Sequence, residues 1–258
     1  MTALVDVVQV SHGYRAENVG QWLPVLHDVS FSVRSGECLG IIGESGSGKS
    51  TLGRILLGLE APKRGQVRLA GQPLYTPRRF WQRPQARQVR VSAVFQDYTS
   101  SANPSMSVLN IVAEPLRGRG VTRREDVRRQ VTELLDLVGL TAELCERFPH
   151  QLSGGQMQRV CIARAIACRP QFIVLDEAVS ALDVSVQVQV LDLLAELRER
   201  LGLTYLFISH DLAAVAYLCQ RVIFLQSGRV IERVDEMSAL GEVRHPYAQQ
   251  LLQSVMTF

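Results

Sequence analysis

Cysteine is scarce and without pattern in this 258-residue chain. The five thiols stand far apart, with neither a Cys-x-x-Cys pair nor the spacing of a metal site: Cys38, Cys145, Cys161, Cys168 and Cys219. Several of them lie inside apolar runs. We therefore expect reduced, mostly buried thiols that play no part in a disulfide framework.

Long apolar runs are also absent, since no stretch approaches the ~20 consecutive apolar residues that a membrane-spanning helix needs. The first residues lack the basic start and the apolar segment of a secretory signal. The sequence therefore predicts a cytosolic chain, linked to any membrane only through a partner.

Strong charge of one sign is missing as well, because the formal net charge is only +3. Arginines nonetheless gather with two aromatic residues in one polar stretch: Arg78, Arg79, Phe80, Trp81, Arg83, Arg87 and Arg90. Basic residues interleaved with aromatic ones can mark a nucleic-acid surface. With so small a net charge, we favour an ordinary solvated face and no nucleic-acid partner.

What the chain does contain is an alternation of short apolar runs with longer segments of helical period, which is typical of an α/β fold. Strands are predicted at 3–10, 25–33, 38–43, 66–71, 91–96, 172–176, 203–210 and the hairpin 221–234. Helices are predicted at 50–59, 122–140, 185–202, 211–220 and 245–255. We expect the first helix to end near Pro62 and Gly65. A helical insertion interrupts the alternation at about 97–168.

A glycine-rich loop, GESGSGKS, follows the predicted strand 38–43 and opens a helix. Small residues let the backbone N–H groups turn inward around an anion at the helix N-terminus. Lys49 can reach the β- and γ-phosphates of a nucleotide, and the Ser50 hydroxyl can bind Mg²⁺. Thr51 can add a further phosphate contact. The loop predicts nucleotide binding without choosing between adenine and guanine.

Two adjacent acids, Asp176 and Glu177, follow the apolar strand 172–175, and Asp183 comes six residues after the second. Ligands of open α/β sheets bind beyond the carboxyl ends of parallel strands. Two carboxylates about 4 Å apart repel by about 4 kcal/mol at an effective dielectric of 20, so a divalent cation would favour the pair. We assign Asp176 to Mg²⁺ and Glu177 to the attacking water. The alternative is the solvated end of a strand.

A third motif, LSGGQ at 152–156, opens a helix near the end of the insertion. Ser153 is a good N-cap, and the glycines leave N–H groups free to meet phosphate oxygens. The chain thus carries a second potential anion site, which a single nucleotide does not explain.

Together these motifs resemble the ATP-binding subunits of ABC transporters, and the resemblance covers nearly the whole chain. GESGSGKS is similar to their Walker A loop, LSGGQ to their signature motif, FIVLDE to their Walker B strand and SALD to their D-loop. Gln96, His210 and Tyr14 match the Q-loop glutamine, the switch histidine and the adenine-stacking aromatic residue. The resemblance implies a P-loop NTPase (RecA-like) core with an N-terminal antiparallel β subdomain and an inserted α-helical subdomain. One such domain would span 1–258, with the insertion at about 97–168 and a helical tail at about 242–258.

The resemblance also implies the roles of single residues. ATP would be bound by Tyr14, Gly43, Glu44, Ser45, Gly46, Ser47, Gly48, Lys49, Ser50 and Thr51, and Mg²⁺ by Ser50, Gln96 and Asp176. Glu177, His210 and Gln96 would be the catalytic group. Ser153, Gly154, Gly155 and Gln156 would act on the ATP of a partner chain paired head to tail, and Asp183 would lie at the seam between the chains.

Within this family the chain most resembles the ATPases of importers for dipeptides, oligopeptides and nickel. Ala178, where proline is commoner, favours the nickel or metal-chelate branch. The implied partners are a second, different ATPase chain, two transmembrane permease subunits at the cytoplasmic face of the membrane and, indirectly, an external substrate-binding protein. Cargo would not pass through this chain, so we expect ordinary structural roles for four histidines: His12, His27, His150 and His245. No cysteine follows Cys219, so we expect no iron–sulfur cluster of the kind found in some relatives.

A second hypothesis is a soluble ABC ATPase that acts in DNA repair or on the ribosome. Such proteins usually carry a long coiled coil within the ATPase or two cassettes in one chain, and this sequence shows neither. The sequence therefore favours transport.

Overall fold

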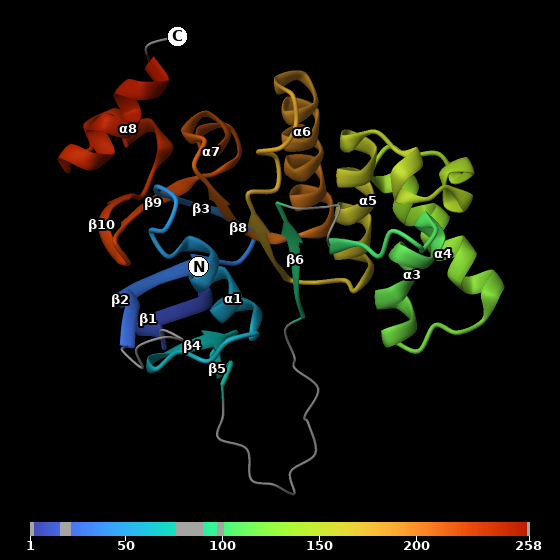
Figure 1. Cartoon of the computed structure of the whole chain (residues 1–258), viewed down its shortest axis with the longest axis horizontal. Coiled ribbons are helices and arrows are strands. Elements are labelled where there is room, and N and C mark those ends of the chain that lie inside the picture. The colour runs from blue at the N-terminus through green and yellow to red at the C-terminus, as the bar shows by residue number, and fades with distance from the viewer. Residues whose placement is uncertain (1–2, 16–21, 76–89, 97–100, 257–258) are drawn as a thin grey trace, which may run out of the picture. The chain divides into compact units, whose positions relative to one another are not determined.

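The structure, a computed structural model, describes residues 3–15, 22–75, 90–96 and 101–256 (Figure 1). Its internal contacts divide the chain into two compact units, one made of Met1–Val89 with Thr204–Phe258 and the other of Arg90–Leu203. Each unit has strands and helices of its own.

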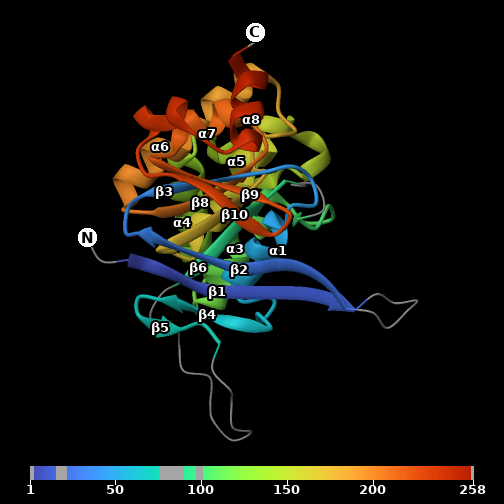
Figure 2. The same cartoon turned by 90° about the vertical axis from the view of Figure 1, so that its left-hand side faces the viewer.

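The first unit opens with a four-stranded antiparallel sheet of order β2-β1-β4-β5. Its strands are β1 (Ala3–Arg15), β2 (Trp22–Arg34), β4 (Arg64–Leu69) and β5 (Gln72–Pro73). Figure 2 shows the long β1 lying between β2 and β4. Valines of three strands are buried, which gives the sheet an apolar face: Val5, Val7, Val10, Val29, Val33 and Val67. The implied N-terminal antiparallel β subdomain is thereby confirmed.

The rest of the first unit is α/β in character. Its strands β3 (Cys38–Ile42), β8 (Thr204–Ser209), β9 (Arg221–Gln226) and β10 (Arg229–Val234) run in the order β10-β9-β3-β8. Strand β3 is parallel to β8 and β9, while β9 and β10 form the predicted hairpin. All residues of β3 and β8 are buried, as is typical of parallel strands. The helices are α1 (Lys49–Leu57), α7 (Leu212–Leu218) and α8 (Pro246–Met256), with a 3-10 turn at Met237–Glu242.

Helix α1 ends earlier than the sequence predicted. Its last residue is Leu57, and Gly58 follows with a φ of 78°. This left-handed conformation lets the N–H of Gly58 bond to the carbonyls of Arg54 and Ile55, which is a glycine C-cap. The predicted range 50–59 therefore overran the helix by two residues, because Gly58 terminates it before Pro62 and Gly65 are reached.

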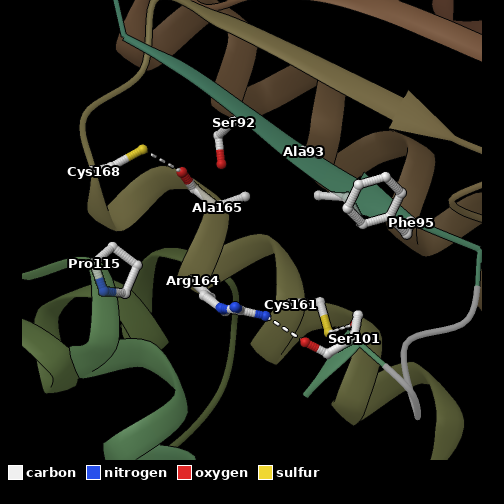
Figure 3. Close-up of a pocket in the computed structure, with 10 residues that line it drawn as sticks. Ser92, Ala93, Phe95, Ser101, Pro115, Cys161, Arg164, Ala165 and Cys168 are labelled. Carbon is white, nitrogen blue, oxygen red and sulfur yellow. Dashed lines mark hydrogen bonds between the residues drawn. The ribbon is translucent and has the colours of Figure 1, made fainter. Parts of the chain in front are cut away.

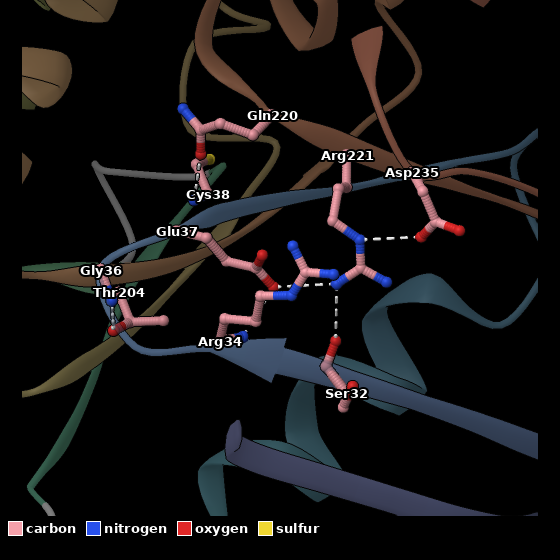
Figure 4. Close-up of polar contacts among 9 residues, drawn as sticks. All are labelled: Ser32, Arg34, Gly36, Glu37, Cys38, Thr204, Gln220, Arg221 and Asp235. Carbon is pink, nitrogen blue, oxygen red and sulfur yellow. Dashed lines mark hydrogen bonds and ion pairs between the residues drawn. The ribbon is translucent and has the colours of Figure 1, made fainter. Parts of the chain in front are cut away.

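A buried ion pair links Arg221 on β9 to Glu37, the residue directly before β3, and Arg221 also bonds to the backbone of β2 (Figure 4). The Arg221 guanidinium donates to Glu37 Oε1 at 3.1 Å, to the Ser32 carbonyl at 3.2 Å and to Asp235 Oδ1 at 3.0 Å. Glu37 Oε1 also accepts from the backbone N–H of Arg34 at 2.7 Å. The Arg221 and Glu37 side chains are only 11% and 9% exposed, so the pair fixes the start of β3.

The second unit contains the parallel strands β6 (Val91–Phe95) and β7 (Phe172–Asp176). Its helices are α3 (Val108–Gly118), α4 (Arg124–Leu137), α5 (Gly154–Ala167) and α6 (Val184–Leu201), with 3-10 turns at Ala142–Glu146 and Pro149–Gln151. Helix α4 buries Val127, Val131 and Leu135. These three residues form one apolar face of the helix.

Three predictions from composition concern the cysteines, the arginine-rich stretch and membrane-spanning helices. All five cysteines are free, and all but Cys168 are buried, as expected. Most of the arginine-rich stretch, Arg78, Arg79, Phe80, Trp81, Arg83 and Arg87, lies outside the described residues, whereas Arg90 donates to the Cys168 carbonyl at 3.2 Å. Among the described helices, none is both long and apolar enough to cross a bilayer.

Candidate functional site

The glycine-rich loop connects the buried end of β3 to the first turn of α1. Two of its glycines allow approaches that a side chain would prevent. A Cβ at Gly43 would overlap the Leu225 carbonyl, and a Cβ at Gly48, whose φ is 101°, would lie 2.7 Å from Leu26 Cδ2. The backbone of the loop therefore packs against neighbouring strands in a form that only glycine permits at these positions.

The loop holds one buried cation. Lys49 is 7% exposed, and its Nζ donates to the carbonyls of Gly43 and Glu44 at 2.6 and 2.9 Å. The buried Ser47 Oγ has no hydrogen-bond partner among the described residues. Helix α1 has neither a side-chain N-cap nor an acid in its first turn. An ammonium group, an unsatisfied hydroxyl and an uncapped helix N-terminus fit the phosphates of a nucleotide.

Tyr14 and Thr51 lie together beside this loop. Tyr14, on β1, donates its hydroxyl to Glu60 Oε2 at 2.7 Å and lies 3.3 Å from Thr51 Oγ1. The His12 ring meets the Tyr14 ring edge-on, with 5.1 Å between centroids, and His12 Nε2 lies 3.4 Å from Glu60 Oε2. The Tyr14 side chain remains 37% exposed. The Tyr14 ring is thus held at its hydroxyl end by polar contacts, and part of its surface stays accessible to the base of a nucleotide.

His210 comes directly after β8, at the carboxyl end of that strand. Because β3 and β8 are parallel and Ile42 pairs with Ser209, His210 and the glycine-rich loop leave the sheet at the same edge. Asp211 caps α7 by accepting from the N–H groups of Ala213 and Ala214 at 2.9 and 3.2 Å. His210 is exposed between the strand and the capped helix.

In the second unit, Gln96 and the acid pair also share one edge. Strands β6 and β7 are parallel, and Phe95 pairs with Asp176. Gln96 therefore leaves β6 where Glu177 leaves β7. Asp176 and Glu177 are half-buried, and Gln96 is exposed. The structure thus brings together an amide and two carboxylates, whose oxygens are the ligand type that Mg²⁺ prefers.

Glu177 has a φ of 53°, which is uncommon for a residue with a side chain. The turn that follows is held by Ser180, whose N–H and Oγ donate to the Glu177 carbonyl at 3.2 and 2.9 Å. Left-handed backbone at a non-glycine residue persists where the surroundings fix it, and such positions cluster at functional sites. The conformation of Glu177 could not be predicted from the sequence.

The LSGGQ segment forms a capping box at the start of α5. Ser153 Oγ accepts from the N–H of Gln156 at 3.3 Å, and Gln156 Oε1 accepts from the N–H of Ser153 at 3.0 Å. A Cβ at Gly155 would lie 2.6 Å from Val186 Cγ1, so this glycine lets α5 pack against the start of α6. Gly154 is the first residue of the helix. Ser153 and Gln156 thus satisfy each other, a role that the spacing Ser-x-x-Gln indicates.

Asp183 is exposed and caps α6, since its Oδ1 accepts from the Ser185 hydroxyl at 2.7 Å and the Val186 N–H at 3.0 Å. These hydrogen bonds, the one from Ser185 first, lower the pKa of the Asp183 carboxyl. Asp183 therefore stays charged where it begins the helix.

A cavity of about 340 Å³ lies among β6, α3 and α5 (Figure 3). Arg164 crosses it, donating to the Ser101 carbonyl at 2.6 Å and pairing with Glu114 at 2.9 Å. Burial raises the pKa of the Cys161 and Cys168 thiols that line it, which makes them poor nucleophiles at neutral pH. Ser101 belongs to this cavity, while residues 97–100 lie outside the described residues.

None of the histidines belongs to a metal cluster in the part of the chain that the structure describes, where no three His, Cys, Asp or Glu residues gather around a possible ion. His12 instead contacts Tyr14 and Glu60, and His150 stacks on Phe148 with 5.9 Å between ring centroids.

Comparison with known sequences identifies relatives over nearly the whole chain. The family described as "ABC transporter" matches residues 26–180. A Brucella abortus protein named as a peptide import ATP-binding protein is 44% identical over 94% of this chain and 72% of its own length. The nickel import ATP-binding protein NikE of Pseudomonas putida is 44% identical over 98% and 93%. The metal-staphylopine import system ATP-binding protein CntF of Staphylococcus aureus is 39% identical over 99% and 100%.

Solved structures agree with the sequence relatives. The ATP-binding cassette MJ0796, in a dimeric post-hydrolysis state bound to ADP and Pi, matches with a TM-score of 0.75 and 29% identity, over 89% of this chain and 97% of that one. The cassette cbiO1 from Clostridium perfringens, part of the ABC transporter complex cbiONQ, matches with a TM-score of 0.77 and 25% identity, over 99% and 95%. The predicted P-loop fold class is therefore confirmed.

Proposed function

The chain belongs to the ABC transporter family, as an ABC-type ATPase, and we propose that it is the ATP-hydrolysing, energy-coupling subunit of an importer for nickel, a metal chelate or short peptides. Relatives named for each of these three kinds of import are 39% to 44% identical to it. Neither these relatives nor the matched structures favour the alternative in DNA repair or translation.

The phosphate loop carries the proposal. The buried Lys49 ammonium lies at an uncapped helix N-terminus, together with the Ser47 hydroxyl, which has no hydrogen-bond partner in the part of the chain that the structure describes; this arrangement suits a polyphosphate. Residues 43–51 would bind the phosphates, with Lys49 on the β- and γ-phosphates. Tyr14 would stack on the adenine, for which its exposed ring leaves a face.

The roles of single residues in hydrolysis are inferred from the motifs of the family. Glu177 would accept a proton from the attacking water, and His210 would hold the γ-phosphate. Ser50, Gln96 and Asp176 would bind Mg²⁺, which, when present, neutralises charge on the phosphate oxygens. The parallel pairing of β6 with β7 supports a common role for Gln96, Asp176 and Glu177.

The LSGGQ helix would serve the nucleotide of a partner chain. Ser153, Gly154, Gly155 and Gln156 stand at the N-terminus of α5, where backbone N–H groups favour an anion. The likeness to a dimeric cassette supports a second ATPase chain. We infer that this partner is a different chain, paired head to tail, and that Asp183 lies at their seam.

The chain would act at the cytoplasmic face of the membrane, held there by two permease subunits and served indirectly by an external substrate-binding protein. We infer one domain over 1–258, with a helical subdomain at about 97–168 and a helical tail at about 242–258. We propose that a helix of a permease subunit docks beside Ser101 and the exposed Phe95.

Uptake by the complete complex tests the proposal. Membrane vesicles that contain the transporter are given ATP inside, the external binding protein, and either radioactive nickel, with and without a chelator, or a radioactive dipeptide. We expect ATP-dependent uptake of one cargo class and its loss in Lys49→Ala. Uptake of none of them, or uptake that does not need ATP, would contradict the proposal.

A further inference from the structure

Gln158 is a fully buried polar side chain, 0% exposed, in the middle of α5. Its Nε2 donates to the carbonyl oxygen of Ala178 at 2.5 Å, while its Oε1 has no partner among the described residues. A buried amide is normally satisfied at both ends. Among the described residues, the hydrogen bond to the Ala178 carbonyl is therefore the one polar contact of the Gln158 side chain.

The carbonyl that Gln158 holds belongs to the residue directly after Glu177. Glu177 is in the left-handed region, with a φ of 53°, and its own carbonyl accepts from the N–H and the hydroxyl of Ser180. Ala178 is 4% exposed. The two peptide groups that follow Glu177 are thus each fixed by a hydrogen bond, one from within the turn and one from α5.

Without the bond from Gln158, the turn would keep the hydrogen bonds within itself, from Ser180 to the Glu177 carbonyl and from Leu182 to the Val179 carbonyl. Left-handed backbone is unfavourable for a residue with a Cβ, so it needs surroundings that hold it. The direction in which the Glu177 carboxylate leaves the chain depends on this backbone conformation. The side chain of Gln158 is therefore placed to decide where the carboxylate points.

We propose that Gln158 is a positioning residue for ATP hydrolysis, which fixes the orientation of the Glu177 carboxylate through its hydrogen bond to the Ala178 carbonyl. The inference rests on the proposed role of Glu177 as the base. Gln158 follows Gln156 by two residues on the same helix. Helix α5 thus carries the LSGGQ motif at its N-terminus and, through Gln158, holds the turn that contains Glu177. Contact of the motif with a partner's nucleotide could therefore be transmitted through this helix to the Glu177 carboxylate.

Two substitutions of Gln158 test this in the full chain assembled with its transporter partners. Gln158→Met keeps the volume but removes the donor. We expect kcat to fall about tenfold, equivalent to about 1.4 kcal/mol lost from the transition state, with KM for ATP within twofold of wild type. Gln158→Glu can donate only while its carboxyl is protonated. Its kcat relative to wild type should therefore fall as the pH rises, while that of Gln158→Met stays constant.

Thr204→Val is the matched control, because Thr204 is also 0% exposed and its hydroxyl accepts one bond, from the Gly36 N–H at 2.9 Å. We expect it to lower the melting temperature without changing kcat. An equal fall of kcat in Thr204→Val and Gln158→Met would mean that lost stability, and not positioning, slows the enzyme, and would overturn the proposal.

The double variant separates this inference from the function on which it rests. If Gln158 acts through Glu177, Gln158→Met has no further effect on the residual hydrolysis of Glu177→Gln. Normal kcat in Gln158→Met beside a slow Glu177→Gln would refute the positioning role alone. Normal turnover in Glu177→Gln would instead refute the proposed base.

Discussion

The buried ion pair between Glu37 and Arg221 offers a quantitative test of what holds the phosphate strand in place. Arg221→Met removes the guanidinium and its bonds to Glu37, the Ser32 carbonyl and Asp235. The Glu37 carboxylate, whose side chain is 9% exposed, then has the Arg34 N–H as its remaining donor among these contacts. The variant thus leaves a buried charge without its counter-ion.

Breaking one side of a buried pair costs about 3–5 kcal/mol. In a chain of this size, each kcal/mol lowers the melting temperature by roughly 2–4 °C. We therefore expect Arg221→Met to melt about 10 °C below wild type when unfolding is followed by circular dichroism at neutral pH. Below that melting transition, KM for ATP should be unchanged, because none of these side chains belongs to the phosphate loop.

Two further variants make the reasoning refutable. Adding Glu37→Gln to Arg221→Met removes the stranded charge, so the double variant should be more stable than Arg221→Met alone, by roughly 2 kcal/mol. Arg200→Met breaks the exposed pair of Arg200 with Glu196, whose side chains are 54% and 58% exposed, and should cost about 0.3–0.5 kcal/mol. If Arg221→Met melts like Arg200→Met, or if the double variant is the least stable of the three, the buried charge does not govern stability here.

Three other outcomes follow from single contacts. Gly155→Ala places a Cβ 2.6 Å from Val186 Cγ1 and should lower the free energy of unfolding, measured by denaturant titration, by about 1–3 kcal/mol. An unchanged midpoint would show that α5 and α6 can move apart to admit the methyl group at no cost. Asp183→Ala removes the N-cap of α6, and because the pKa of Asp183 is lowered in the folded chain, the stability difference from wild type should be present near neutral pH and vanish as the pH falls through that pKa. A difference that grows in acid would contradict this. Burial raises the pKa of Cys161, so iodoacetamide should modify it slowly in the native chain at pH 7, and rapid labelling seen by mass spectrometry would count against the packing of α5.

Periodicity and apolar runs were enough to predict most of the fold, because each strand and helix has a local signal. Buried parallel strands read as continuous apolar runs, as in 38–42 and 205–208. The end of α1 was missed because Gly58, Pro62 and Gly65 can each stop a helix. Only the three-dimensional path shows that Gly58 adopts the left-handed conformation first.

The sequence predicted which residues belong to the candidate site, but not which of them lie next to each other. Register between distant strands, such as Ile42 with Ser209 and Phe95 with Asp176, depends on sheet order and has no local signal. The N-cap role of Asp183 could have been found, since an aspartate directly before a helical segment is a common cap. No local pattern indicates that Gln158 reaches the Ala178 carbonyl, because that contact needs α5 to pack beside the turn after β7.

The most direct test of the central claim compares nucleotide binding with hydrolysis in the complete transporter. Wild type, Lys49→Ala and Glu177→Gln are each given radiolabelled MgATP, and bound nucleotide and released phosphate are measured in the same samples. The account predicts that wild type binds and hydrolyses ATP, that Lys49→Ala binds it weakly, and that Glu177→Gln binds it while phosphate release falls by orders of magnitude. Near-normal phosphate release by Glu177→Gln, or unchanged ATP affinity in Lys49→Ala, would contradict it.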